Sequence, residues 1–363
     1  MQSNARRRMI SIVEHFRLHR TFLLVIGIWP YNQSKFVELQ FSLFFAVPHS
    51  FIIFQLTSFI TSECTVDLII KILSTISFLL MCTVHHISFG INACSVKCFV
   101  ERLQHVCNDI KDENEIAIIE KYGNSAEYIT IIITLFAVCC VIIITVLPFL
   151  PWILGTFLLA NESRPFHNML IVTEYFVDKE KHFYLIILHT YASIYIGVTA
   201  MVGAGMMLAS YLKHICGLFS IARLSEFFMS NFNGTYICLI VIAVICLCLN
   251  LYEVFQTTLL RGNVEEILLH LIFASAIVLY TFVANYTGEE IMHHYNDMFS
   301  MAYSVQWYTA PIRIQRLILF LLQRSCKVYR LKIAGIFITS LEGFASLSTA
   351  SLSYFTVIYS TRE

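Results

Sequence analysis

The sequence predicts an all-α membrane protein with seven transmembrane helices, a cytoplasmic amino terminus and an extracellular carboxyl terminus. Of the 363 residues, 58% are hydrophobic and only 13% are charged, whereas soluble domains carry about 25% charged residues. The formal net charge is zero, so the composition gives no sign of a nucleic-acid partner. The Lys and Arg residues are unevenly distributed between alternate loops. These features indicate a chain that crosses a membrane several times.

Seven stretches have the length and composition of transmembrane helices. Crossing the hydrocarbon takes about 20 mostly apolar residues, and no ten-residue alternation typical of a membrane barrel occurs. The first six stretches contain no charged residue, and the seventh is interrupted only by Glu342. They are residues 39–62, 72–96, 128–161, 182–212, 227–252, 267–288 and 333–361.

The basic residues predict which side of the membrane each loop faces. One set of alternate loops, which includes the amino-terminal segment, holds eighteen Lys and Arg residues, while the other set holds five. Cytoplasmic loops carry the excess of Lys and Arg. The amino terminus is therefore predicted to be cytoplasmic, and an odd number of spans places the carboxyl terminus outside. The sequon at Asn161 then falls in an outer loop, where glycosylation is expected.

Two segments outside the spans are too polar to cross. Residues 1–38 begin with a basic run, but Glu14, Arg17 and Arg20 interrupt any signal-peptide core, so we predict an interfacial or re-entrant amphipathic segment. In residues 289–335, the longest apolar run, Leu317 to Leu322, is six residues long. We predict an amphipathic cytoplasmic helix there that packs against partners, or alternatively a basic segment that touches anionic lipid.

The last predicted span carries a stripe of hydroxyls. A spacing of three and four residues places Glu342, Ser346, Thr349, Ser353, Thr356 and Ser360 on one helical face. The opposite side carries Phe344, Leu347, Phe355 and Ile358. Two interpretations remain open: helix packing with the hydroxyls bonded to their own backbone, or the wall of a water-filled pore.

No motif indicates an enzyme, a cofactor or a metal site. The twelve Cys residues are scattered through apolar stretches without zinc or disulfide spacing. Gly203-x-Gly205 lies inside a predicted span with no strand before it, so it is predicted to be a site of close helix packing rather than a nucleotide loop. No nucleophile elbow, P-loop or His-Glu-x-x-His motif occurs.

Several stretches resemble the insect odorant receptor family. The densest run begins with "GEEIMHHYNDMFSMAYSVQWY" at Gly288 and ends with "AGIFITSLEGFASLSTASLSYFTVIYS". Further upstream, "GIWP", "EYFVDKEKHFY" and "HICGLF" fit the same family. The resemblance implies a seven-helix subunit (pore helix in residues 336–363) of a tetrameric, odorant-gated, non-selective cation channel. It also implies a shared co-receptor, membrane lipid and a small volatile odorant as partners, and the plasma membrane of a sensory neuron dendrite as location. The short connection between spans 4 and 5 resembles that of a tuning subunit, not the co-receptor.

The resemblance also implies sites. Its odorant pocket, within residues 39–288, lies in the outer half among spans 2, 3, 4 and 6, where each side chain could equally be ordinary bundle packing. The expected residues are Ser74, Phe78, Thr145, Phe149, His189, Ser193, Ile196 and Phe273. The pore constriction falls at Val357, with Thr361 one turn further out. Glu342 could attract cations or form a packing hydrogen bond.

Two other functions remain open: a gustatory-type receptor channel and a metabotropic seven-helix receptor. The orientation of the termini distinguishes the metabotropic receptor from the channel, because an outward amino terminus would contradict the channel.

Overall fold

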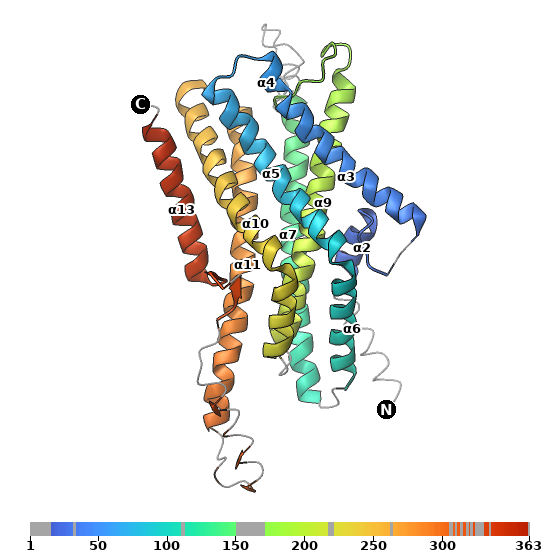
Figure 1. Cartoon of the computed structure of the whole chain (residues 1–363), viewed down its shortest axis with the longest axis vertical. Helices are drawn as coiled ribbons and strands as arrows, with labels where there is room; N and C mark the ends of the chain where they lie inside the picture. Colours follow the sequence, from blue (N-terminus) through green and yellow to red (C-terminus); the bar gives the residue numbers. More distant parts are fainter. Residues whose placement is uncertain are drawn as a thin grey trace, which may run out of the picture.

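The computed structural model describes residues 16–31, 34–109, 113–149, 171–216, 221–261, 264–304, 330–333 and 335–361, with isolated positions between 308 and 323. Six long helices form an elongated bundle (Figure 1). They are α3 (Lys35–Leu56), α5 (Val66–Ile91), α7 (Glu113–Val146), α9 (Phe183–Cys216), α10 (Ile221–Gln256) and α11 (Val264–Ser304). The shorter elements are α2 (Arg17–Val25), α4 (Ser58–Thr61), α6 (Ala93–Asp109), the 3-10 turn η1 (Leu147–Phe149), the π-helical turn η2 (Thr257–Arg261), the strands β1 (Lys332–Ile333) and β2 (Phe337–Ile338), and α13 (Leu341–Ser360).

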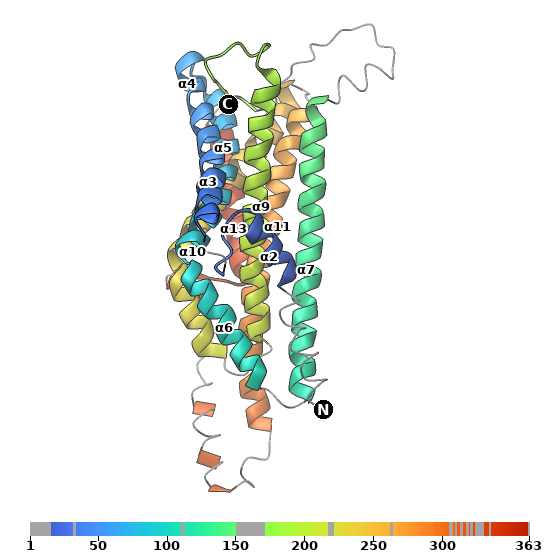
Figure 2. The ribbon, with the colours of Figure 1, turned by 90° about the vertical axis from the view of Figure 1, so that its right-hand side faces the viewer.

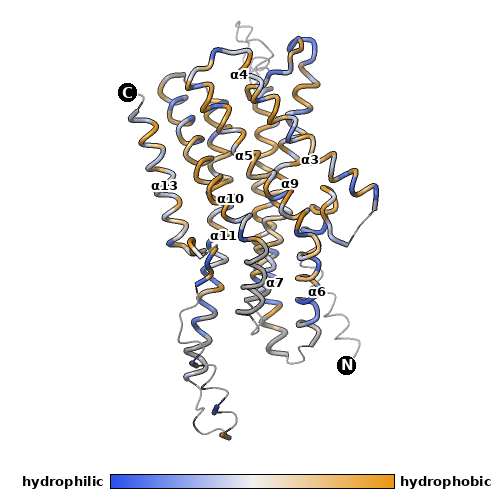
Figure 3. The backbone as a smooth tube through the Cα atoms, viewed as in Figure 1, coloured by the Kyte–Doolittle hydropathy of each residue, from blue (hydrophilic) through white to orange (hydrophobic). Residues whose placement is uncertain are grey.

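Six helical stretches of the described residues are long and apolar enough to cross a membrane. They are Lys35–Thr61, Val66–Ile91, Ile119–Phe149, Phe183–Lys213, Phe232–Leu259 and Val264–His294. These overlap the first six predicted spans, so the prediction of six long apolar helices is confirmed. The α13 helix is not among them, and the seventh span and the orientation of the termini stay predictions. In Figure 3 the orange, hydrophobic stretches follow the long helices of the bundle.

Local sequence signals fix where several helices begin. Ser34, Thr65 and Ser340 each adopt an extended conformation and accept a hydrogen bond from the backbone N–H three residues later, which caps α3, α5 and α13. A carboxylate in the first turn, Asp67 in α5 and Glu342 in α13, complements the positive end of the helix. Glu342 therefore has a structural role at the start of α13 as well as a place on the hydroxyl face.

The α2 helix is a short element packed into the side of the bundle. Leu23 and His19 are fully buried, and His19 Nε2 lies 2.7 Å from the hydroxyl of Ser210 on α9. Gly203 of α9 allows this approach, because a Cβ there would lie 2.9 Å from Cβ of Phe22. The close-packing role predicted for Gly203 is confirmed. Figure 2 shows α2 lying across α9.

The α11 helix and the hairpin that follows it connect the bundle to α13. The helix continues to Ser304, so the predicted boundary after residue 288 falls inside it. The predicted amphipathic helix around Leu317 to Leu322 lies largely outside the described residues. The strands β1 and β2 pair antiparallel, and Gly335, at φ 74°, forms part of their turn. From this hairpin α13 runs along α10 and α11 and ends at the same end of the molecule as α4 (Figure 1).

Candidate functional site

A cavity lies between α5, α7, α9 and α11, and we call it the α7 cavity. About 550 Å³ of space lies between these helices, counting the open solvent at its mouth. Its lining is Phe78, Ile133, Phe136, Ala137, Cys140, Val141, Ile144, Val198, Met201, Val202, Met206, Ile272, Phe273, Ala276, Leu279 and Tyr280. None of these residues is charged, so the cavity suits a small apolar molecule.

Two aromatic contacts form walls of the α7 cavity. The rings of Phe78 on α5 and Phe273 on α11 stack with their centroids 4.4 Å apart. Tyr280, lower on α11, hydrogen-bonds through its hydroxyl to Nε2 of the buried His85. Because that hydroxyl already has a partner, the wall it forms is mainly the face of its ring. Stacked aromatic rings offer a rigid surface for an apolar or aromatic ligand.

The structure brings only part of the predicted pocket to this cavity. Phe78 and Phe273 line it. Thr145 lies one residue beyond Ile144, and its hydroxyl bonds to that of Tyr195 at 2.6 Å and to the carbonyl of Val141 at 2.7 Å. Ser74 is buried, and its hydroxyl donates to the carbonyl of Lys71. Neither residue lines the cavity, and Phe149 in η1 does not either.

His189, Ser193 and Ile196 face a different helix and do not line the α7 cavity. Nε2 of His189 lies 3.0 Å from the hydroxyl of Ser50 on α3, and its Nδ1 lies 2.7 Å from the hydroxyl of Tyr175. Ser193 donates to the carbonyls of His189 and of Val47 on α3. Ile196 packs in a small hollow beside α3 and α5. These three residues do share one face of α9, but that face holds α3.

Sequence reasoning missed the cavity residues of α9. Val198, Met201, Val202 and Met206 line it, and they follow one another at intervals of one, three and four residues. A plain apolar face gives no chemical signal in a helix that is apolar nearly all round. The available signal was indirect: once the polar His189 and Ser193 face one neighbour, the residues across the helix must face another.

A polar layer closes the bundle at the α4 end. Lys71 of α5 and Glu266 of α11 form an ion pair of 2.6 Å. Nδ1 of His270 lies 3.0 Å from Oδ1 of Asn250, whose amide nitrogen donates to the carbonyl of Cys246. These contacts join α5, α10 and α11 next to Phe273, and they fix the helices that form that wall of the cavity.

The segment 171–182 covers the α4 end of α3. The backbone N–H of Glu174 donates to the carbonyl of Phe54, and Thr57 donates to the carbonyl of Glu174. Burial alone would raise the pKa of Glu174, but Lys179 and the backbone N–H of Phe176 donate hydrogen bonds to its carboxylate, and its pKa lies below the usual value. Burial raises the pKa of Tyr175 to about 12, so Tyr175 stays a neutral hydrogen-bonding partner of His189.

The α13 helix turns the hydroxyls of its predicted stripe away from the bundle, whereas Ser351 is buried. Ser346, Thr349, Ser353, Thr356, Val357, Ser360 and Thr361 are all exposed in the single chain, as is Glu342, and Val357 is 57% exposed. The opposite side packs inward. Phe344 meets Phe282 edge-to-face, and Phe355 and Ile358 pack against a cluster of Ile70, Leu249 and Tyr252.

Most hydroxyls of α13 bond to the helix's own backbone. Ser346 donates to the carbonyl of Glu342, Thr349 to that of Ala345, and Thr356 to that of Ser353. Such bonds use the hydrogen of each hydroxyl and leave both lone pairs of its oxygen free to accept hydrogen bonds from water or another chain. The face is therefore suited to a polar surrounding, although its hydrogen-bonding needs are already partly met.

Two residues of α11 hold the start of α13. Oδ1 of Asn285 accepts the backbone N–H of Ser340 at 3.3 Å, and Oε2 of Glu289 accepts that of Leu341 at 3.1 Å. Gly343 lies so close to the hairpin that a Cβ would be 2.4 Å from the carbonyl oxygen of Ile338. These contacts tie the position of α13 to that of α11, which also forms one wall of the α7 cavity.

Two comparisons with known proteins give the same result. The family model described as 7tm Odorant receptor matches residues 220–352. That segment includes α10, α11, the hairpin and most of α13. The resemblance to the insect odorant receptor family is confirmed.

Solved structures show the same fold. The insect olfactory receptor OR5 from Machilis hrabei in complex with eugenol superimposes with a TM-score of 0.80 at 15% identity, covering 97% of this chain and 99% of that one. Another structure of that receptor gives a TM-score of 0.78 at 15% identity, covering 96% and 98%. No curated protein matches the chain.

The matched family model describes odorant receptors, and six described helices are long and apolar enough to cross a membrane, so the chain resembles a multi-pass membrane receptor and not an enzyme. Among the described residues, no three His, Cys, Asp or Glu side chains are placed to hold a metal ion. The predicted glycosylation site at Asn161 lies outside the described residues.

Proposed function

We propose that this odorant receptor is the tuning, ligand-binding subunit of a heteromeric, odorant-gated, non-selective cation channel. It crosses the plasma membrane of a sensory neuron dendrite seven times, with its amino terminus in the cytoplasm and its carboxyl terminus outside. A shared co-receptor subunit completes the channel, and a small volatile odorant opens it.

The α7 cavity is the observation that carries this proposal. It is uncharged, bounded by four helices and walled by stacked aromatic rings. Such a site binds by apolar contact and by shape. A receptor of the same fold has been solved in complex with eugenol, a small aromatic molecule, which supports a ligand of the same chemical class here. The ligand would be held mainly by Phe78, Phe273 and the apolar face of α9.

The charge distribution supports the orientation. Lys97, Arg102, Lys121 and Lys213 lie on α6, the start of α7 and the end of α9, all at the α6 end of the molecule (Figure 1). The excess of basic residues marks the cytoplasmic side. The α4 end, where α13 finishes, would then face outward.

Current through the assembled channel tests the subunit role. The chain expressed alone should give no odorant-evoked cation current, and the chain expressed with the family's co-receptor should respond to a subset of a panel of small volatile compounds. The co-receptor alone is the control. Equal responses to the same odorants with and without this chain would contradict a tuning role, as would robust current from this chain alone.

Thiol accessibility tests the role of α13. We propose that its hydroxyl face lines the conduction path and that Val357 forms the constriction. Cysteines placed at Ser346, Thr349 and Ser353 should react with a charged, water-soluble thiol reagent when odorant opens the channel. Cysteines at Phe355 and Ile358, which pack on the bundle, should stay unreactive.

The same experiment separates a pore from helix packing. A hydrophobic constriction excludes water from a closed pore, so Val357→Ala should raise the leak current and Val357→Ser should raise it further. Equal reactivity on the two faces of α13, with unaltered leak in both variants, would favour helix packing as the role of the hydroxyls.

A further inference from the structure

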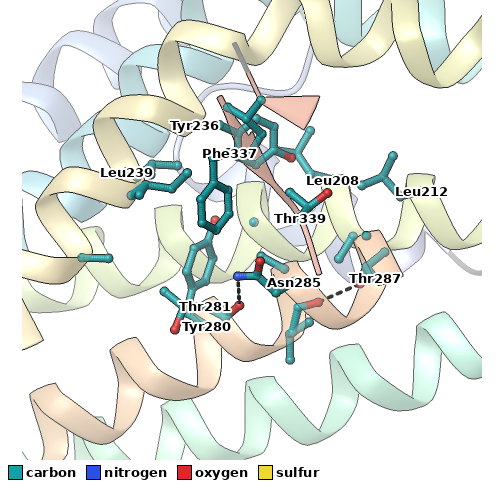
Figure 4. Close-up of a pocket in the computed structure, with 18 of the residues that line it drawn as sticks. Leu208, Leu212, Tyr236, Leu239, Tyr280, Thr281, Asn285, Thr287, Phe337 and Thr339 are labelled. Carbon is teal, nitrogen blue, oxygen red and sulfur yellow. Dashed lines mark hydrogen bonds between the residues drawn. The ribbon is translucent and has the colours of Figure 1, made fainter. Parts of the chain in front are cut away.

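A second cavity lies between α9, α10, α11 and the β1–β2 hairpin, and we call it the hairpin cavity (Figure 4). It encloses about 780 Å³ of empty space, including its mouth. Residues of α9 and α10 form one side, Tyr280 to Gly288 of α11 form another, and Phe337 and Thr339 of the hairpin close it. Leu347 of α13 also lines it. The odorant site proposed above does not use this cavity.

The polar groups around the hairpin cavity are nearly all satisfied within the protein. Thr281 donates to the carbonyl of Ile277, Thr287 to that of Val283, and Thr339 to that of Leu331. The amide nitrogen of Asn285 donates to the carbonyl of Thr281, as Figure 4 shows. These groups offer few hydrogen-bond sites to water, so an aliphatic molecule suits the space better than a polar one.

The hydroxyl of Tyr236 is the exception. Tyr236 of α10 lines the cavity beside Phe337 (Figure 4), and no described residue accepts a hydrogen bond from its hydroxyl. Tyr236 is partly buried, and a phenol hydroxyl that faces an apolar cavity normally finds a partner. An occupant that carries one acceptor, such as a carbonyl oxygen, would supply it.

The cavity also adjoins the contacts that position α13. Asn285, on its wall, holds the N–H of Ser340, and Thr339 precedes that residue directly. Two side chains, Met206 and Tyr280, line both this cavity and the α7 cavity. Tyr280 cannot move toward α9, because Gly205 is already so close that a Cβ there would lie 2.6 Å from its ring. An occupant of the hairpin cavity therefore packs against both the anchor of α13 and the partition from the odorant site.

We propose that the hairpin cavity is a second binding site, which takes an aliphatic molecule with one hydrogen-bond acceptor that Tyr236 contacts. Its occupant sets how firmly the hairpin holds α13 and so alters the response to odorant. The effect on the response rests on the proposed channel function, whereas the binding itself does not. The acyl chain of a phospholipid and a free aliphatic ketone or ester share this chemistry.

Photolabelling of the purified chain tests the site without any current. The probe is an aliphatic ketone of about ten carbons that carries a diazirine, and labelled residues are located by mass spectrometry. Two matched variants lie eight residues apart on α11: Ala284→Phe fills the hairpin cavity, and Ala276→Phe fills the α7 cavity. Labelling around Tyr236 should fall by about tenfold in Ala284→Phe and persist in Ala276→Phe. Unchanged labelling around Tyr236 in Ala284→Phe would overturn the proposal.

A smaller change tests the same site without the risk that a large introduced side chain disturbs the fold. Tyr236→Phe removes only a hydroxyl, so it should lower the affinity of the ketone probe by about 2- to 10-fold, the worth of one hydrogen bond. A diazirine-bearing alkane of the same length should bind both forms equally. Equal loss for ketone and alkane, or no loss for the ketone, would show that Tyr236 does not contact the acceptor.

A further experiment distinguishes a phospholipid acyl chain from a free aliphatic molecule as the occupant. The receptor is reconstituted in vesicles of phosphatidylcholine, part of which carries a photoreactive acyl chain. If an acyl chain is the occupant, the lipid labels the region around Tyr236 and displaces the ketone; if a free molecule is the occupant, the ketone labels it despite the lipid. Labelling of this region by neither probe would overturn the site. If the wild-type chain binds a probe in the hairpin cavity but Ala284→Phe leaves the odorant-evoked current unchanged, only the modulatory role is overturned.

Discussion

Helix α9 has two buried sides of opposite chemistry. On the side that meets α3, His189 and Ser193 hydrogen-bond to α3, and His189 also hydrogen-bonds to Tyr175. On the side that meets the α7 cavity, Val198, Met201 and Val202 make only apolar contacts and leave space. In a membrane bundle, polar side chains join helices because their groups must be satisfied within the protein. A polar residue in a span therefore marks packing more readily than it marks a site for an apolar ligand.

Adjacent residues on the two sides offer the strongest test of this contrast. Val198 lines the α7 cavity, and Val198→Phe should fill part of it, raising the half-maximal odorant concentration by about a hundredfold, equivalent to about 2.7 kcal/mol of lost binding. Its neighbour Gly197 faces α5, where a Cβ would lie 3.1 Å from Cβ of Cys82. Gly197→Ala should reduce the amount of receptor at the cell surface but leave the half-maximal concentration unchanged. Dose–response curves normalised to surface labelling measure both, and a Gly197→Ala shift as large as that of Val198→Phe would contradict the assignment.

His189 sharpens the comparison from the packed side. His189→Leu keeps the approximate size of the side chain but removes its hydrogen bonds with the hydroxyls of Ser50 and Tyr175, so it should destabilise the fold by about 1–2 kcal/mol. Thermal unfolding of the detergent-purified receptor measures the loss. Because His189 lies away from the cavity, the order of odorant preference should be unchanged. A changed order of preference would return His189 to the ligand site, as the sequence alone had suggested.

The smallest effect on stability is expected in the segment 171–182, which covers the α4 end of α3. The pKa of Glu174 is lower in the folded receptor than the ordinary 4.5, so its carboxylate stabilises the fold above about pH 4.5, and this contribution is lost as the pH falls through the folded value. Lys179 is half exposed, which limits the gain to below about 1 kcal/mol. Melting temperatures between pH 3 and pH 7 should fall more steeply at the acidic end for the wild type than for Glu174→Gln. Parallel curves would show that the ion pair contributes nothing.

The hydrophobic pattern of the sequence was enough to predict the six long helices, because each span must satisfy its own backbone in lipid and so needs a long apolar run. The spacing of hydroxyls and aromatics in α13 likewise predicted two distinct faces, since a helix repeats every 3.6 residues. Phe344, Phe355 and Ile358 do pack on the bundle, while Ser346, Thr349 and Ser353 lie exposed.

Only the tertiary structure decided which face of each apolar helix meets a cavity. Spans that are apolar all round carry no periodic signal for their orientation. The predicted ligand residues therefore included Phe78 and Phe273 but not Met201 and Met206, although all four line the α7 cavity. The same limit applies to α2 and to the anchor of α13. These depend on close approaches at Gly203 and Gly343 and on backbone hydrogen bonds accepted by Asn285 and Glu289. Such contacts join residues up to 181 positions apart in the chain. Contacts between distant segments arise from helix packing, and no local pattern of residues encodes them.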